Sequence, residues 1–349
     1  CIECGILMIF DIKVFIRFVG IVIVTLTFTF LFNNFLNFWS GWPGVDNLFK
    51  NYGWFGLGYL QEQLQSDKLV KSWIQFFSYI IIFSLTFIYA YKAKNRTLLK
   101  DSELLSSLSA YIIRASFWIV LIIGITDMIL SFLRVEGFSK HIFGDSLGIA
   151  LGIPNFRGTY VHFPLMLLSL IIAYFTRTLG FLWLALLVVI AEFQIVLARF
   201  IFSYEQTFMG DLVRFWYGAL FLFASSYALI HEGHVRVDVL YTRFSKHAKA
   251  WSNLLGSLLL GVPICWTILF RGMWGKQNII NAPLTNFETS QSGYGMFIKY
   301  IMAGFLAIYA LTMLIQFASY FLSNSSTLLE DSKDNNKNLS KITNSTIGS

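Results

Sequence analysis

FLWLALLVVIAEFQIVLARFIF, residues 181–202, decides the fold class of this chain. The stretch is apolar throughout apart from Glu192, Gln194 and Arg199. A bilayer core of about 30 Å is crossed by roughly 20 residues of α-helix, so both length and composition match a transmembrane helix. This stretch therefore predicts an integral membrane protein built from helices.

Further apolar stretches of the same kind lie on both sides of it. One of them, 160–176, is shorter than the others and carries His162 and Pro164 near its start. The expected spans are 14–32, 72–91, 112–133, 160–176, 179–202, 212–230, 251–270 and 300–322. The sequence thus predicts an all-α integral membrane protein with about eight transmembrane helices.

The composition excludes a water-soluble enzyme. Of the 349 residues, 56% are hydrophobic and 13% are charged, with a mean hydropathy of +0.64, whereas a soluble domain carries about a quarter charged residues. Basic residues collect at the ends of the apolar stretches and do not interleave with aromatics, so no nucleic-acid partner is expected. Cys1, Cys4 and Cys265 form neither a disulfide framework nor a four-ligand set, and no metal site is expected.

The distribution of Lys and Arg orients the expected helices. Cytoplasmic connections carry an excess of basic residues. With the N-terminus in the cytoplasm, more of the 26 Lys and Arg residues fall on inner segments than on outer ones. An even number of spans then returns the C-terminus to the same side, so both termini are expected in the cytoplasm.

Three parts are expected along the chain. Residues 1–178 hold four spans and a long outer loop, 33–71, whose tryptophans favour an interfacial re-entrant or amphipathic segment. Residues 179–322 hold four spans with short connections, which predicts a compact bundle. Residues 323–349 are polar, and a disordered tail is expected there.

Ionisable side chains inside the spans need an explanation, because each costs roughly 2.5–3.5 kcal/mol at the centre of a membrane helix. Glu192 lies near the middle of its span, and Arg199 follows two turns later on the same face. Two interpretations are open for Glu192: a proton or coupling-ion site, or a protonated carboxyl bonded to a neighbouring helix or partner while Arg199 reaches the interface. Asp127, nearer the outer end of the third span, is expected to be structural.

Catalytic and haem sites are not expected. A haem held by two histidines needs them to face each other within the spans, and only His162 of the 5 histidines lies in an expected span. The sequence has no HExxH motif, P-loop or nucleophile elbow. No enzyme activity and no cofactor are therefore expected.

The connection after the sixth span, HEGHVRVDVLYTRFSKHAKAW (231–251), has an ordered pattern. His234, Arg236 and Asp238 alternate with valines, so an extended segment carries the three polar residues on one side. Asp238 is placed to cap a basic amphipathic helix that lies along the membrane surface. We expect these three residues to order the inner connector.

This part of the chain resembles the small membrane subunit of tripartite ATP-independent periplasmic (TRAP) transporters, the DctQ family. The resemblance rests on GHVRVDVLY (233–241), directly after a span that opens with Asp211 and Arg214. An acidic residue and an arginine at the start of that span, small residues within it, and an H-x-x-V-D-like run at its inner end are typical of the family. The resemblance covers about 179–322.

The resemblance implies a scaffolding subunit in a bacterial inner membrane. Its implied partners are a large DctM-type permease, a periplasmic DctP-type solute-binding protein that delivers an organic acid, and membrane lipid. It places Na⁺ coupling in the large subunit, with no cofactor in this chain. The implied partner or scaffold motif is His234, Arg236, Asp238, Asp211 and Arg214.

Residues 1–178 depart from the family pattern, because its members commonly have only the four-span bundle. They are expected to be an additional N-terminal membrane region. Two rival functions stay open: an autonomous secondary transporter that uses Glu192 and Asp127, and a membrane anchor of a respiratory complex. A permease partner, no partner, or haem absorbance on purification distinguishes the three.

Overall fold

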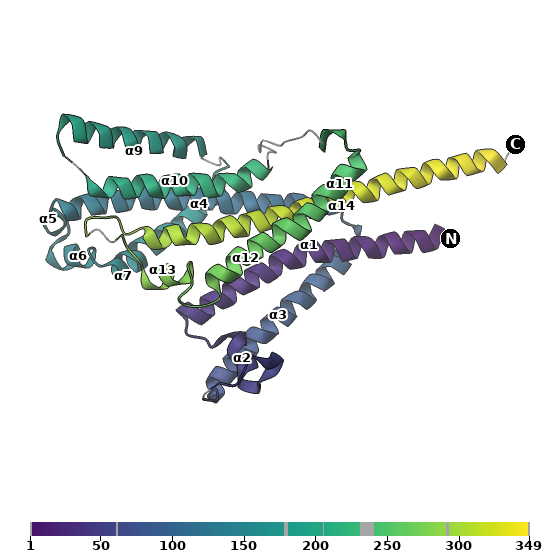
Figure 1. Cartoon of the computed structure of the whole chain (residues 1–349), viewed down its shortest axis with the longest axis horizontal. Helices are drawn as coiled ribbons and strands as arrows, with labels where there is room; N and C mark the ends of the chain where they lie inside the picture. Colours follow the sequence, from purple (N-terminus) through teal and green to yellow (C-terminus); the bar gives the residue numbers. More distant parts are fainter. Residues whose placement is uncertain are drawn as a thin grey trace. The chain divides into compact units, whose positions relative to one another are not determined.

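Helices make up most of the described chain (Figure 1). The computed structural model describes residues 2–60, 62–177, 181–204, 206–230, 241–290 and 293–347. In chain order the helices and helical turns are α1 (Ile2–Trp39), α2 (Gly44–Tyr52), η1 (Trp54–Gly56), α3 (Ser66–Lys92), η2 (Ala93–Asn95), α4 (Leu98–Val135), α5 (Ser139–Phe143), α6 (Asp145–Ala150), α7 (Pro154–Arg157), η3 (Gly158–His162), α8 (Phe163–Phe175), α9 (Phe181–Ile201), α10 (Thr207–Ile230), η4 (Tyr241–Arg243), α11 (Lys246–Gly256), η5 (Ser257–Gly261), α12 (Val262–Met273), α13 (Asn281–Asn286) and α14 (Lys299–Ile347). These ranges contain no β-strand.

Within these described ranges, 8 helical segments are long and apolar enough to cross a bilayer. At 1.5 Å per residue, a core of about 30 Å needs roughly 20 residues of helix. The segments are Ile12–Trp39, Ser66–Asn95, Leu98–Val135, Pro154–Phe175, Leu182–Ile201, Thr207–Leu229, Lys246–Met273 and Lys299–Glu330. The expected all-α membrane fold with about eight spans is confirmed, including four spans in the C-terminal part.

The third span is longer than expected from hydropathy alone. We expected it over 112–133, but α4 runs unbroken from Leu98 to Val135. No Gly or Pro interrupts its first turns. Asp101 lies in the first turn, where a carboxylate is favoured by the helix dipole. The connection before it therefore shrinks to a few residues around η2.

The last helix continues where we expected a disordered tail. α14 passes Leu322 and ends at Ile347. Residues 323–347 contain no Gly or Pro that breaks a helix. Ser325 is buried, and Leu329 packs against the cluster around Leu322. The first turns of the polar stretch are therefore part of the packed structure.

The chain divides into two compact units. The first comprises residues 1–106, 235–265 and 314–349. Its small apolar cluster centres on Leu98, Phe321 and Leu322. Arg17 of α1 and Asp101 of α4 form a buried ion pair beside it, with 2.6 Å between Nε and Oδ2.

The segment between α1 and α3 contains the short helix α2 and the helical turn η1. The Gln75 side chain accepts the Gly44 N–H at 2.9 Å and so holds the start of α2 against α3. Gly53 ends α2 at φ +64°, and a Cβ there would lie 2.5 Å from the Tyr59 ring. Both the left-handed backbone and the close ring require glycine at this position.

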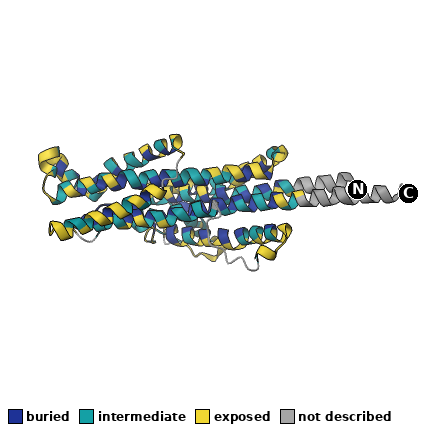
Figure 2. Ribbon diagram, turned by 90° about the horizontal axis from the view of Figure 1, so that it is seen from above, coloured by how far each residue is buried: buried dark blue, intermediate teal, exposed yellow. Residues whose placement is uncertain are grey.

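The second unit comprises residues 107–234 and 266–313. Its apolar core draws on several helices, with Ile123 of α4, Leu184 of α9, Phe215 of α10 and Phe305 of α14 buried together. Exposed residues alternate with buried ones along the described helices (Figure 2). Many of the exposed side chains are large and apolar, as a surface that faces lipid requires.

Each unit combines segments from both sides of residue 178. In the first unit, Ser102 of α4 hydrogen-bonds Ser319 of α14, with 2.9 Å between the two hydroxyls. In the second, the Ser109 hydroxyl donates to the Thr312 carbonyl at 3.1 Å. In both units, α4, which precedes residue 178, therefore packs on α14. The separate roles expected for 1–178 and 179–322 stay a prediction.

Candidate functional site

The second unit contains a buried polar centre around Asp127. One carboxylate oxygen, Oδ1, lies 2.8 Å from Arg157 Nη1 and 3.2 Å from His162 Nε2. The other, Oδ2, accepts the Phe297 backbone N–H at 2.7 Å. The side chains of Asp127, Arg157 and His162 are at most 1% exposed. The carboxylate is thus paired with a cation and bonded at both oxygens, as a buried charge requires.

A π-helical turn, η3, follows Arg157 and ends at His162, and both side chains reach Asp127. Pro154 starts α7 at a position where its missing N–H costs nothing. The Arg157 Nε–H also donates to the Leu151 carbonyl at 2.8 Å, which orients the guanidinium. Five residues later, His162 Nδ1 lies 2.7 Å from the Tyr300 hydroxyl. Since a carboxylate only accepts, a neutral His162 donates through Nε2 and accepts from Tyr300 at Nδ1.

The loop before α14 is held between two arginines. The Phe297 ring lies 4.4 Å from the Arg134 guanidinium carbon and 4.2 Å from that of Arg157, measured to the ring centroid. The Arg134 Nη2–H also donates to the Gly295 carbonyl at 2.6 Å. Cation–π contacts of this kind are strengthened by desolvation. They hold the loop against α4 and α7.

Asp211, which the family resemblance singled out, binds the same loop. Its Oδ2 accepts the Met296 backbone N–H at 3.0 Å. Asp211 of α10 and Asp127 of α4 therefore hold two consecutive peptide N–H groups, those of Met296 and Phe297. Arg214 lies 3.7 Å from Asp211, but its side chain is 76% exposed. Of these two residues, Asp211 fixes the loop, whereas Arg214 is mostly exposed.

We predict that Asp211→Ala lowers the free energy of unfolding by about 1–2 kcal/mol, because the buried Met296 N–H loses its acceptor. Arg214→Ala is the matched control, since an exposed pair contributes at most about 1 kcal/mol. Equilibrium unfolding of both variants in bicelles measures the difference. Equal effects of the two substitutions would contradict the assigned role of Asp211.

The other residues predicted from the sequence lie elsewhere. Glu192 and Arg199 are exposed on α9, and no hydrogen bond or ion pair joins either of them to the described part of the chain. His234, Arg236 and Asp238 lie outside the described residues. The structure therefore brings together Asp127 and Asp211 but not Glu192 or Arg199.

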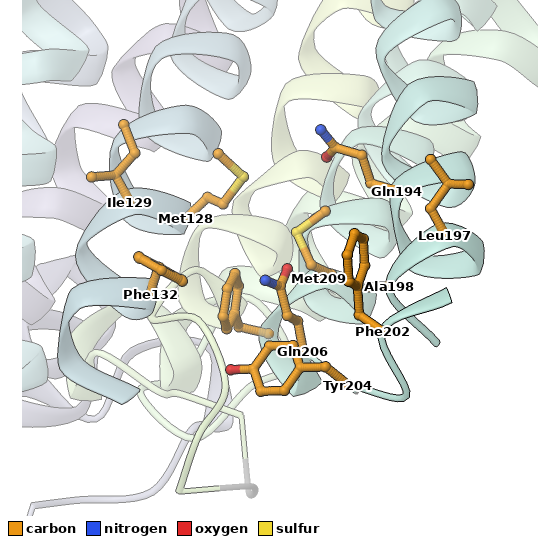
Figure 3. Close-up of a pocket in the computed structure, with 11 residues that line it drawn as sticks. Met128, Ile129, Phe132, Gln194, Leu197, Ala198, Phe202, Tyr204, Gln206 and Met209 are labelled. Atoms are coloured by element: carbon orange, nitrogen blue, oxygen red, sulfur yellow. The ribbon is translucent and has the colours of Figure 1, made fainter. Parts of the chain in front are cut away.

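A cavity of about 610 Å³ lies between α4, α9 and α10 (Figure 3). Most of its lining is apolar, and Gln194, Tyr204 and Gln206 are its polar side chains. The Tyr204 hydroxyl donates to the Glu136 carboxylate, which raises the pKa of the Tyr204 phenol. The volume of the cavity is in the range of ligand pockets. Its lining does not match a site for a carboxylate substrate, because no cationic side chain lines it.

Sequence reasoning missed the partners of Asp127. Neither hydropathy nor charge singled out Arg157, and His162 stood out only as a histidine inside an expected span. A signal was present in the spacing, because Arg157 and His162 flank the start of a short span that follows an acidic residue in the previous one. Tyr300, which bonds His162, is distant in sequence and offers no local signal. The described residues contain no cluster of three or more His, Cys, Asp or Glu side chains that could bind a metal ion.

Comparison with known protein families gives a match to the C-terminal part of the chain. Residues 185–323 match the family described as tripartite ATP-independent periplasmic transporters, DctQ component. No curated protein and no solved structure matches the chain. The resemblance inferred from the sequence is confirmed for this region, which begins within α9 and ends within α14. Asp211 and Tyr300 lie inside it, whereas Asp127, Arg157 and His162 precede it.

Proposed function

We propose that this chain is the small membrane subunit of a TRAP transporter, because residues 185–323 match the DctQ family. In this proposal it scaffolds a large DctM-type permease, which takes up an organic acid together with Na⁺. A periplasmic DctP-type binding protein delivers that acid. The observation that carries the proposal is the family match, which coincides with four membrane spans.

The chemistry of the polar centre supports a scaffold over an autonomous transporter. Asp127 is bonded to Arg157, His162 and a backbone N–H, so its carboxylate has no free oxygen for a coupling ion. The cavity beside α9 is mainly apolar. Neither feature supplies a polar binding site near mid-membrane, where secondary transporters hold substrate and ion.

The proposed location is the bacterial inner membrane, with both termini in the cytoplasm. Eight spans and the excess of Lys and Arg on the inner connections support this orientation. In it, the connections after α4, α9 and α12 face the periplasm. The loop held by Asp127 and Asp211 is then on the side from which a binding protein delivers substrate.

Co-purification tests the proposal. We predict that the tagged full chain, co-expressed with its cognate DctM-type permease, retains that permease through affinity and size-exclusion steps in mild detergent. Proteoliposomes with both membrane subunits, the binding protein and a Na⁺ gradient should accumulate the organic acid. Proteoliposomes with this chain alone should not accumulate it.

Two results would contradict the proposal. Uptake by the chain without the large subunit would make it an autonomous transporter. Haem absorbance in the purified chain, together with no bound permease, would favour an anchor subunit of a respiratory complex. An empty-vesicle sample and a sample with permease alone are the controls for leakage and for independent permease activity.

A further inference from the structure

We propose that one flank of α9, marked by Ala185, Glu192 and Arg199, is the contact surface for a transmembrane helix of the large permease. Glu192 bonds a basic or amide side chain of that helix. The inference rests on the proposed function, because the occupant is the large subunit. It goes further by naming the surface and the chemistry of the contact.

The flank is defined by helical geometry. Successive residues turn by about 100° around an α-helix, so positions seven apart differ by only about 20°. Ala185, Glu192 and Arg199 therefore form one row along α9. Ala191 and Leu184, at most 2% exposed, mark the side packed into the core of the unit. Glu192 is turned about 100° from Ala191 and lies beside that packed side.

Glu192 is too deep in the span to reach water. It lies nine residues from Ile201, the end of α9, and eleven from Phe181, its start. At 1.5 Å per residue these are about 13 Å and 16 Å, more than a glutamate side chain spans. Arg199 is two residues from the end of α9 and reaches the interface by extending its long side chain. Of these two residues of α9, Glu192 is the one at mid-depth in the membrane.

Lipid does not satisfy a group in this position. Hydrocarbon offers no hydrogen-bond donor, and an ionisable side chain at mid-depth normally faces protein or a water-filled cavity. Glu192 is exposed on the surface of the described chain, and it has no hydrogen-bond or ion-pair partner among the described residues. A carboxyl group in this setting requires a donor from outside the described chain.

Charge complementarity specifies the occupant. A helix that fits this row carries a donor such as Lys, Arg, His, Asn or Gln at mid-depth, opposite Glu192. Toward the outer end it carries an acceptor opposite Arg199. The small side chain of Ala185 allows the two backbones to approach closely, as packed membrane helices require. The other side of α9 is already committed, because Gln194 and Ala198 line the cavity shared with α4 and α10.

Photo-crosslinking of the complex tests the surface. A photoreactive amino acid is placed at Ala185 or Val196, which share the side of Glu192, and at Leu186 or Ile190, which face away from it. All four variants are made in the full chain and co-expressed with the cognate permease. Crosslinks to the permease should be several times stronger from Ala185 and Val196 than from the other two. Equal or reversed yields, or crosslinks mainly to a second copy of this chain, would overturn the proposal.

Substitution of Glu192 tests the chemistry. Glu192→Leu should weaken association with the permease roughly three- to thirtyfold, the range for interhelical hydrogen bonds in membranes. Glu192→Gln, which still hydrogen-bonds, should retain most of it. Ile190→Leu is the matched control on the opposite flank. Leucine inserts into membranes more readily than glutamate, so a lost complex does not reflect failed insertion.

The two proposals fail in different ways. If the wild-type chain does not bind the permease, the proposed function fails. If the wild type binds and Glu192→Leu binds equally well, the function stands and the assignment of Glu192 is wrong.

Discussion

Asp127→Ala should lower the free energy of unfolding by about 3–5 kcal/mol, the largest single effect that we expect in this protein. The substitution leaves the Arg157 guanidinium, 1% exposed, without its carboxylate. It also removes the acceptor for the Phe297 N–H and the His162 ring. An uncompensated buried charge is costlier than the lost attraction itself. Steric trapping in bicelles measures this free energy directly.

Two comparisons show that burial causes the effect. Asp46→Ala removes a carboxylate whose ion pair with Lys50 is about a third exposed, so a loss below about 1 kcal/mol is expected. The double variant Asp127→Leu with Arg157→Met removes both charges and should recover part of the loss. If Asp127→Ala costs no more than Asp46→Ala, Asp127 and Arg157 do not form a desolvated pair.

Gly158→Ala should cost about 3 kcal/mol, at the upper end of the range for an overpacked core. A Cβ at this position would lie 2.3 Å from two ring carbons of Phe287. Phe287 is buried and has a backbone φ of +49°, so its ring cannot withdraw without moving the backbone. Gly158 belongs to a helical turn, where alanine is normally preferred over glycine. A loss of stability would therefore come from the contact with Phe287.

Gly210→Ala provides the matched control with the opposite sign. Gly210 lies in α10, and a Cβ there meets no atom within 4 Å. Alanine should therefore stabilise the helix by about 0.5–1 kcal/mol. The same bicelle measurement compares the two variants. A stabilising Gly158→Ala would show that the Phe287 ring does not pack against this turn.

Inside one unit, these two sites connect the N-terminal part of the chain with the part that matches the DctQ family. Asp127 binds a peptide of the loop before α14, and Gly158 accommodates Phe287. We therefore expect deletion of residues 1–178 to destabilise the loop before α14, as well as to remove helices. Asp211 would still accept the Met296 N–H of that loop.

The sequence by itself was sufficient for the membrane class and the number of spans. Hydropathy is a local property, because the bilayer requires a fixed length of apolar helix whatever its neighbours are. It was also sufficient to detect the resemblance of the C-terminal part to the DctQ family, since the pattern around Asp211 and Arg214 lies within a short stretch. It did not reveal the true ends of α4 and α14, because polar residues without Gly or Pro are compatible with either helix or tail.

Only the tertiary structure decided which polar groups meet. The pairing of Asp127 with Arg157 and His162 links two helical segments, and Tyr300 of α14 joins from 138 positions beyond His162. The serines at 102 and 109 are seven residues apart on α4, and their partners at 319 and 312 are equally spaced on α14. A periodicity shows that a face exists, but it does not identify the helix that covers it. That choice depends on packing across long sequence separations, which no local pattern of residues records.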